Sequence, residues 1–183
     1  MLFAHDTELA LIGAAALVNT DGSDGEKLPD VASLTAFLET YGWTGRHDGT
    51  EEELRSVRRL RPRLRQIWYE DEDGVVAIVN ALLREARALP QLVRHNGEPY
   101  HLHATPPDAP LVRRMAVEAA MAFADVVRSG ELSRLRICDY PGCGNVVVDL
   151  SKNRSKRYCD AGCGNRAAVA AYRARRITST SGR

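Results

Sequence analysis

The sequence predicts a mainly α-helical protein with a small β-hairpin, an α+β fold in which a helical N-terminal domain precedes a small cysteine-bearing module. Three observations lead to this prediction. Apolar residues recur at intervals of three and four along most of residues 1–130, which is typical of amphipathic helices. An Asn-Gly pair lies between two short alternating runs, which is typical of a hairpin. All four cysteines fall within 26 residues near the C-terminus.

The composition is that of a soluble globular chain. It has 183 residues and a formal net charge of +1, and 44% of its residues are hydrophobic, which is enough to build a core. The longest apolar stretch, Leu9–Val18, has about half of the roughly 20 residues that a membrane-spanning helix needs. It also lacks the basic leader of a signal peptide. We therefore expect a cytoplasmic protein with no membrane contact.

The balanced net charge conceals two oppositely charged parts. Residues 1–131 carry a net charge of −7 and all five histidines. Residues 132–183 carry a net charge of +8 and all four cysteines. This asymmetry favours contact with an anionic partner through the C-terminal end only.

Two helices are predicted in the first 42 residues. The first ends at the polar turn 19–22, and its expected inward face comprises Leu9, Ile12, Gly13, Ala16 and Leu17. A polar loop over residues 21–30 follows. The second helix ends at Gly42. Its expected inward face comprises Leu34, Phe37, Leu38 and Tyr41.

Two further helices are predicted before residue 90. Thr50 and Glu53 have the spacing of a capping box at the start of the third. Pro62 lies inside this helix and is expected to kink or split it. Its expected inward residues are Leu54, Val57, Leu64 and Trp68. After the acidic turn 70–74, residues 75–89 form a fourth helix that buries Val75, Ile78, Val79, Leu82, Leu83 and Ala86.

Residues 91–104 change to the alternating period of strands. A two-residue turn at Asn96-Gly97 would pair Val93 with Tyr100. A long helix then runs to about Ser129 and ends at Gly130. Its expected inward residues are Leu111, Met115, Ala119, Ala122, Phe123 and Val126.

The cysteines predict one structural zinc ion. Cys138, Cys143, Cys159 and Cys163 follow the pattern C-x4-C-x15-C-x3-C, two close pairs joined by a short insert, as a tetrahedral zinc site requires. Four thiolates leave no open position for catalysis. Two disulfides are an alternative, but they need an oxidising compartment, and unrelated structural thiols are another.

The residues around the cysteines predict a treble-clef-like finger. A knuckle at 141–145 precedes a hairpin, in which the run 146–148 pairs with the run 156–158 across a polar turn. An Ala-rich helix over residues 167–176 follows Cys163. Its N-terminal end is expected to favour a thiolate at this cysteine.

These motifs resemble a known family. Residues 132–176 are similar to the CGNR zinc finger, because both cysteine pairs, the turn SKNRSKRY and the tetrapeptide at 163–166 occur in order. Residues 1–130 are similar to the ABATE domain that usually precedes this finger, through the segments LVNT, LRPRLR and VNAL. Pro62 departs from the smooth helix expected of the family. The resemblance implies a bacterial-type, stress-linked transcription regulator whose finger binds DNA.

The expected domain organisation follows from this resemblance. An ABATE-like helical domain for sensing or dimerisation covers residues 1–130, the finger covers residues 131–178, and a flexible tail covers residues 179–183.

The basic residues of the finger are the candidate nucleic-acid contacts. Those expected on DNA phosphates in the hairpin are Lys152, Arg154, Lys156 and Arg157. Those expected on the last helix are Asn165, Arg166, Arg173, Arg175 and Arg176. The Ala side of this helix would pack on the hairpin, and Asn165 and Arg166 would read base edges in a major groove. Alternatively, Asn165 caps the helix or bonds a cysteine sulfur, and Arg166 neutralises the thiolates.

Four polar residues of the helical part are candidate ligand contacts. Asn19, Arg61, Arg65 and Asn80 fall within the family segments, beside apolar faces. Arg61 and Arg65 are four residues apart, so that both could hold one anionic group of a small effector. Helix caps and ion pairs are the alternative roles. A homodimer formed through this part is a further option.

The sequence contains no catalytic motif that predicts an enzyme. It lacks a phosphate-binding glycine loop, a G-x-S-x-G elbow and an H-E-x-x-H pair. His101 and His103 have a spacing that metals can use. The expected register, however, places them on the face of Arg94, away from Val93, as a solvated face. The sequence thus predicts a DNA-binding regulator. The alternative is an adaptor whose basic finger binds an acidic protein or RNA.

Overall fold

The computed structural model describes residues 2–94 and 100–180, with side chains described up to residue 175. The helices in these ranges are α1 (His5–Val18), α2 (Val31–Thr40), α3 (Glu51–Gln66), α4 (Glu72–Glu85), α5 (Leu111–Arg128), the short 3-10 helix η1 (Leu132–Arg134) and α6 (Cys163–Thr180). The strands form three antiparallel pairs: β1 (Asp21–Gly22) with β2 (Gly25–Glu26), β3 (Gln91–Val93) with β4 (His101–His103), and β5 (Leu135–Ile137) with β6 (Val146–Val148). The α+β class is confirmed.

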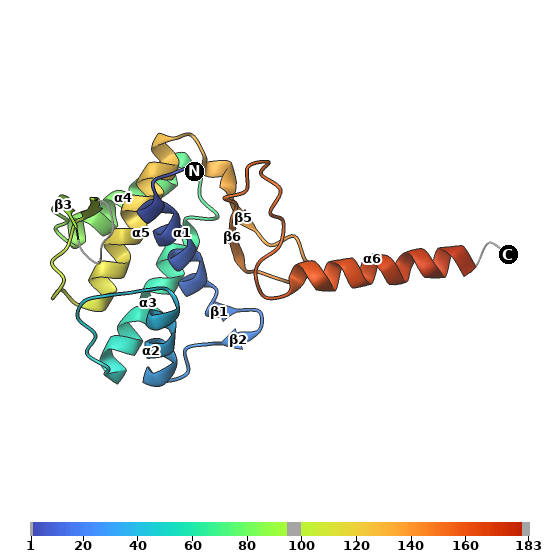
Figure 1. The fold of residues 1–183 in the computed structure, drawn as a ribbon, viewed down its shortest axis with the longest axis horizontal. Helices are drawn as coiled ribbons and strands as arrows, with labels where there is room; N and C mark the ends of the chain where they lie inside the picture. Colours follow the sequence, from blue (N-terminus) through green and yellow to red (C-terminus); the bar gives the residue numbers. More distant parts are fainter. Residues whose placement is uncertain (1, 95–99, 181–183) are drawn as a thin grey trace.

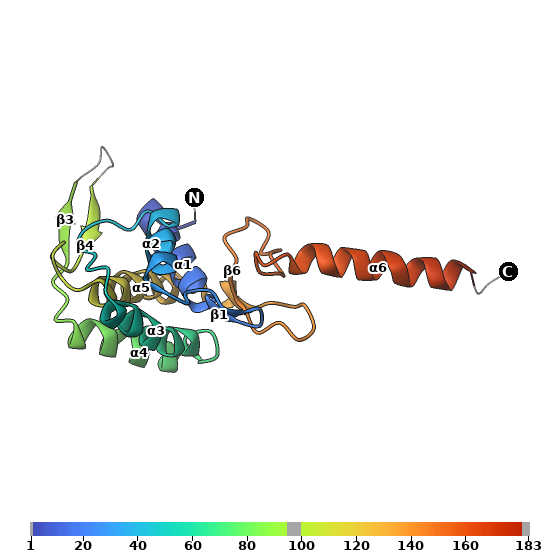
Figure 2. The same cartoon turned by 90° about the horizontal axis from the view of Figure 1, so that it is seen from below.

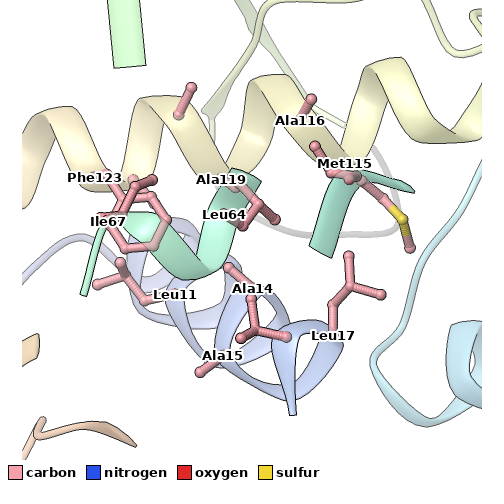
Figure 3. Packing of buried hydrophobic residues seen from close by; sticks show 14 of the residues in the cluster. Leu11, Ala14, Ala15, Leu17, Leu64, Ile67, Met115, Ala116, Ala119 and Phe123 are labelled. Carbon is pink, nitrogen blue, oxygen red and sulfur yellow. The ribbon is translucent and has the colours of Figure 1, made fainter. Parts of the chain in front are cut away.

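The core lies where α1, α3 and α5 meet, with α4 packed on the far side of α5 (Figure 1). Figure 3 shows Leu11 of α1, Leu64 of α3 and Phe123 of α5 together, and all three are fully buried. Figure 2 shows the β3–β4 pair at one end of the helical body and α6 projecting from the other. No helix of the described part combines the length and the apolar character that a membrane crossing requires.

The inward face of α1 differs from the predicted one. Leu9 and Ile12, expected inside, are 55% and 44% exposed. Because α1 is apolar on nearly all sides, its spacing does not mark one face. Of the predicted face, Gly13 and Leu17 are buried, and the other buried apolar residues of α1 are Leu11, Ala14, Ala15 and Val18.

The start of α3 is confirmed at Thr50, whose hydroxyl accepts a hydrogen bond from the Glu53 N–H at 3.2 Å. The other half of the capping box differs, because the Glu53 carboxylate accepts from the N–H groups of Asp48 and Gly49. Pro62 does not split the helix, which runs unbroken from Glu51 to Gln66.

The β3–β4 register differs from the predicted one by one residue. Val93 pairs with His101 rather than with Tyr100. The predicted Asn96-Gly97 turn itself lies outside the described residues. Since a shift of one residue exchanges the faces of a strand, His101 and His103 lie on the side of Val93 and not on that of Arg94.

The strand partner of β6 also differs. β6 pairs with β5, which precedes the first cysteine, and residues 156–158 form no strand. The buried Asp149 carboxylate accepts the N–H groups of Ser151 and Lys156 and thereby holds residues 149–156 as a loop. Successive side chains of β6 point to opposite faces of the strand. Val146 and Val148 join the helical core, whereas Val147 packs on the cysteines.

Candidate metal centre and nucleic-acid interface

Three short segments bring the four cysteines together. Cys138 follows β5, Cys143 lies in the turn before β6, and Cys159 lies in the loop that leads to α6, of which Cys163 is the first residue. All four are buried and free, and their Sγ atoms lie within 4.8 Å of one another.

The distances between the sulfurs fit a zinc ion and are longer than a disulfide bond. The Cys143–Cys159 and Cys159–Cys163 Sγ atoms are 3.8 and 3.5 Å apart. A disulfide needs about 2.05 Å. Zinc–sulfur bonds of about 2.3 Å in a tetrahedron place neighbouring sulfurs about 3.8 Å apart. The four cysteines therefore form a zinc-binding site with a closed coordination sphere.

Hydrogen-bond donors surround the sulfurs. The Asn145 amide donates to Cys159 Sγ at 3.4 Å, and the Arg166 guanidinium donates to Cys163 Sγ at 2.9 Å. Arg166 also stacks over the Tyr140 ring at 5.0 Å. Such donors offset the negative charge of four thiolates around one zinc ion and orient the ligands.

The thiol pKa values of the cysteines differ, because burial and hydrogen bonding act on them to different extents. Burial raises the pKa of the Cys163 thiol to about 12 and raises the pKa of the Cys138 thiol as well. The pKa of Cys143 falls to about 7, because hydrogen bonds from the Asn145 backbone and the Ser23 hydroxyl outweigh its burial. Zinc therefore has to displace protons when it binds to these thiols, which makes metal binding depend on pH.

Three side chains of the helical part bind the backbone beside the zinc site. The Asn19 amide pairs with both the N–H and the carbonyl of Val146, each at 2.8 Å. The Arg65 guanidinium donates to the Gly144 carbonyl at 2.9 Å, and the Trp68 indole donates to the Val147 carbonyl at 3.0 Å. The finger is thus anchored on the helical core at its metal-binding end.

These contacts also show where the four candidate ligand residues lie. Asn19 and Arg65 bind backbone at the finger, and Arg61 forms a two-point ion pair with Glu26, both N···O distances being 2.7 Å. Asn80 is exposed on α4. Arg61 and Arg65 therefore bind different partners within the chain, and the structure does not bring the four residues to one acceptor.

The Arg61–Glu26 pair predicts an acid-dependent contribution to stability. The Arg61 hydrogen bond lowers the pKa of Glu26 from 4.5 to about 2. Glu26→Gln should lower the free energy of unfolding at neutral pH by about 1–2 kcal/mol, since the Arg61 side chain is only 6% exposed. The contribution is fully present above the unfolded-state pKa. The difference between variant and parent should therefore shrink as the pH falls from about 5 towards 2.

Urea unfolding at several pH values measures this difference. Glu52→Gln is the matched control, because its carboxylate pairs with the exposed Arg55 and Arg59 and should contribute much less to stability than Glu26 does. A Glu26→Gln effect that stays constant down to the lowest pH would show that the ion pair does not contribute as described.

The basic residues of the loop before α6 are mostly ion-paired. Arg154 lies 2.9 Å from Glu131, Lys156 lies 3.2 Å from Asp160, and Arg157 lies 2.8 Å from Asp139. Lys152 is exposed, and no ion pair joins it to another of the described residues. These ion pairs lie at the surface, where an incoming phosphate can replace a carboxylate with little loss of free energy.

Helix α6 is exposed along nearly its whole length. The expected packing of its Ala side on the hairpin is wrong, because residues 168–175 are exposed and the helix projects from the body (Figures 1 and 2). It begins at the zinc ligand Cys163, so the metal site holds its base. Asn165, Arg166, Arg173 and Arg175 are exposed on it, and the side chain of Arg176 lies outside the described part. The helix also extends through Thr180, beyond the expected start of a tail at residue 179.

The sequence prediction missed Asn145 as the bonding partner of a sulfur. Asn145 stands in the same Cys-Gly-Asn order as Asn165, one cysteine pair earlier. This repetition is the signal that was available. Asn145 is 1% exposed and bonds Cys159, whereas Asn165 is exposed.

Comparison with family models gives two matches. Residues 134–176 match the CGNR zinc finger. Residues 14–130 match the ABATE domain, whose description is "Putative stress-induced transcription regulator". None of the curated proteins compared with the chain matches it. The two matches confirm the architecture expected from the sequence, and neither is an enzyme family.

Proposed function

Because the chain belongs to the family of ABATE-domain proteins with a CGNR zinc finger, we propose that it is a cytoplasmic, DNA-binding transcription regulator that docks through α6 and the loop before it. The observation that carries this proposal is the exposed, basic α6, which starts at a zinc ligand and projects from the body. With 18 residues it is about 27 Å long, and a major groove of about 12 Å width admits such a helix.

The candidate contacts differ in exposure and in the ion pairs that they form. Arg173 and Arg175 on α6 and Lys152 on the preceding loop are exposed and are the first choices for phosphates. Arg154, Lys156 and Arg157 would exchange a carboxylate for a phosphate. Asn165 is the better candidate for reading a base edge, because Arg166 is engaged by the Cys163 sulfur.

We propose that residues 1–130 receive the signal that controls binding, through a small effector or through a homodimer. Support comes from the bonds of Asn19, Arg65 and Trp68 to the backbone of the turn and strand that lead from Cys143. Any change that moves the ends of α1 or α3 would be transmitted to this backbone.

Reversing charge on α6 tests the proposal. The double variant Arg173→Glu/Arg175→Glu should weaken binding to duplex DNA and lower the salt slope of the affinity by about 2, since each lost phosphate contact removes about 0.9. Fluorescence anisotropy of a labelled duplex at several salt concentrations measures both quantities.

The control reverses two arginines on another helix. Arg55→Glu/Arg59→Glu changes the net charge equally, but these residues lie outside α6, on α3 before Arg65, the α3 side chain that bonds the finger. Equal loss of affinity in both variants would indicate unspecific charge attraction. If the α6 variant binds as the parent does, the docking proposal is wrong. Binding to RNA or to an acidic protein instead of duplex DNA would favour the adaptor function.

A further inference from the structure

Two histidines and a carboxylate lie close together on the β3–β4 arm and the adjoining helix α5, at the end of the helical body opposite α6. A cavity of about 1380 Å³ lies between this arm, the start of α1, residues 41–45 and the start of α5. His101 and His103 line it, since the observed register turns both imidazoles to the side of Val93. Both are half-buried, whereas Leu102 between them points the other way and is 46% exposed.

The two imidazoles have the separation of ligands on one metal ion. The Nε2 atoms of His101 and His103 are 3.1 Å apart. With metal–nitrogen bonds of about 2.0–2.1 Å, two imidazole ligands are about 2.9 Å apart at a right angle and about 3.4 Å apart in a tetrahedron. The observed distance lies between these two values.

A carboxylate supports one of the rings from behind. Glu118 of α5 places Oε1 3.3 Å from His103 Nδ1. A proton held on Nδ1 by this carboxylate leaves the lone pair on Nε2, the atom that faces His101. A carboxylate behind a histidine is the usual outer support of a metal ligand, because it fixes the tautomer and makes the ring a stronger donor.

We propose that His101 and His103 are the two protein ligands of a divalent transition-metal ion whose other coordination positions open into this cavity. Imidazole ligands favour zinc, nickel or copper over magnesium or calcium. Water or an oxygen donor of a small molecule would complete the coordination sphere from the side of the cavity. The ion would thus mark the binding place of a chelating ligand in the helical part.

Titration of the zinc-loaded full chain with Ni²⁺, and separately with Zn²⁺, tests this proposal. Calorimetry should show one further equivalent beyond the zinc of the finger. His101→Ala and His103→Ala should each abolish it, and Glu118→Gln should weaken it about 10- to 100-fold. Leu102→Ala, on the opposite face of the same strand, is the control and should bind as the parent does.

Nitrogen chemical shifts of the imidazoles provide a test without any variant. Since the chain has only five histidines, each ring can be followed. Zn²⁺ should move the Nε2 resonances of His101 and His103 and leave those of His5 and His47 in place. A simple hydrogen bond between the two rings predicts no further equivalent and no such movement. That result would overturn the proposal, as would uptake that persists in the His101→Ala/His103→Ala variant.

Discussion

Removal of the zinc ion should lower the thermal stability of the whole chain, including its helical part. In isolated fingers, zinc contributes about 10–16 kcal/mol at neutral pH. Here the contribution reaches further, because Val146 and Val148 of β6 pack in the helical core while Val147 between them packs on the cysteines. Loss of the metal site removes the support of one side of this strand and so weakens the other.

Two probes followed during heating measure this effect. Far-UV circular dichroism reports the helices, and tryptophan fluorescence in a Trp43→Phe background reports Trp68, which bonds the Val147 carbonyl. With a chelator, and in Cys163→Ser, both transitions should move together to a lower temperature. A helical transition that stays in place while zinc is released would show that the finger is an independent unit. A metal-free, disulfide-linked chain would refute the zinc site itself.

Trp68→Ala should cause the largest loss of stability among single core substitutions that leave the cysteines intact. Its ring is 7% exposed and meets Phe123 edge to face at 5.2 Å, and its indole N–H donates to the Val147 carbonyl. Truncating a buried aromatic side chain typically lowers the free energy of unfolding by about 3–5 kcal/mol. The unpaired carbonyl in the core adds about 1–3 kcal/mol.

Two controls separate the parts of this effect in urea unfolding. Trp68→Phe keeps most of the ring packing and should lose chiefly the hydrogen bond. Tyr69→Ala alters the next residue, which is 62% exposed, and should stay within about 0.5 kcal/mol of the parent. If Trp68→Ala and Tyr69→Ala lower the free energy of unfolding equally, the packing between core and finger is not as described.

The sequence predicted those parts of the fold that depend on neighbours along the chain. Thr50 marks the start of α3, and Gly42 and Gly130 lie just past the ends of α2 and α5 with positive φ angles of 66° and 64°. Caps, glycine stops and cysteine spacings act over a few residues, so the pattern contains the necessary information.

Features that depend on distant partners were not predictable in this way. The inward side of α1 is decided by α3 and α5, since α1 itself is apolar all round. The partner of β6 is decided by Asp149, which is buried and holds the following residues in a loop instead of leaving them free to form a strand. The one-residue error in the β3–β4 register placed His101 on the wrong face.

The candidate metal site likewise has some residues that the sequence predicts and others that it does not. The four cysteines followed from their spacing, but the residues that anchor the site did not. Asn19 bonds a backbone group 127 residues away, and Arg65 bonds one that is 79 residues away. The sequence predicts both as ligand contacts, since it shows the polar side chain and not the backbone group to which that side chain bonds.

Selection of bound duplexes from a random DNA pool, with and without a chelator, tests the central claim that zinc holds a basic helix in place for DNA. The full chain with its zinc should enrich a subset of duplexes at about 0.15 M salt, and the chelator should abolish the enrichment, because α6 begins at Cys163 and loses its anchor. Absence of enrichment with zinc, or equal enrichment without it, would contradict the account.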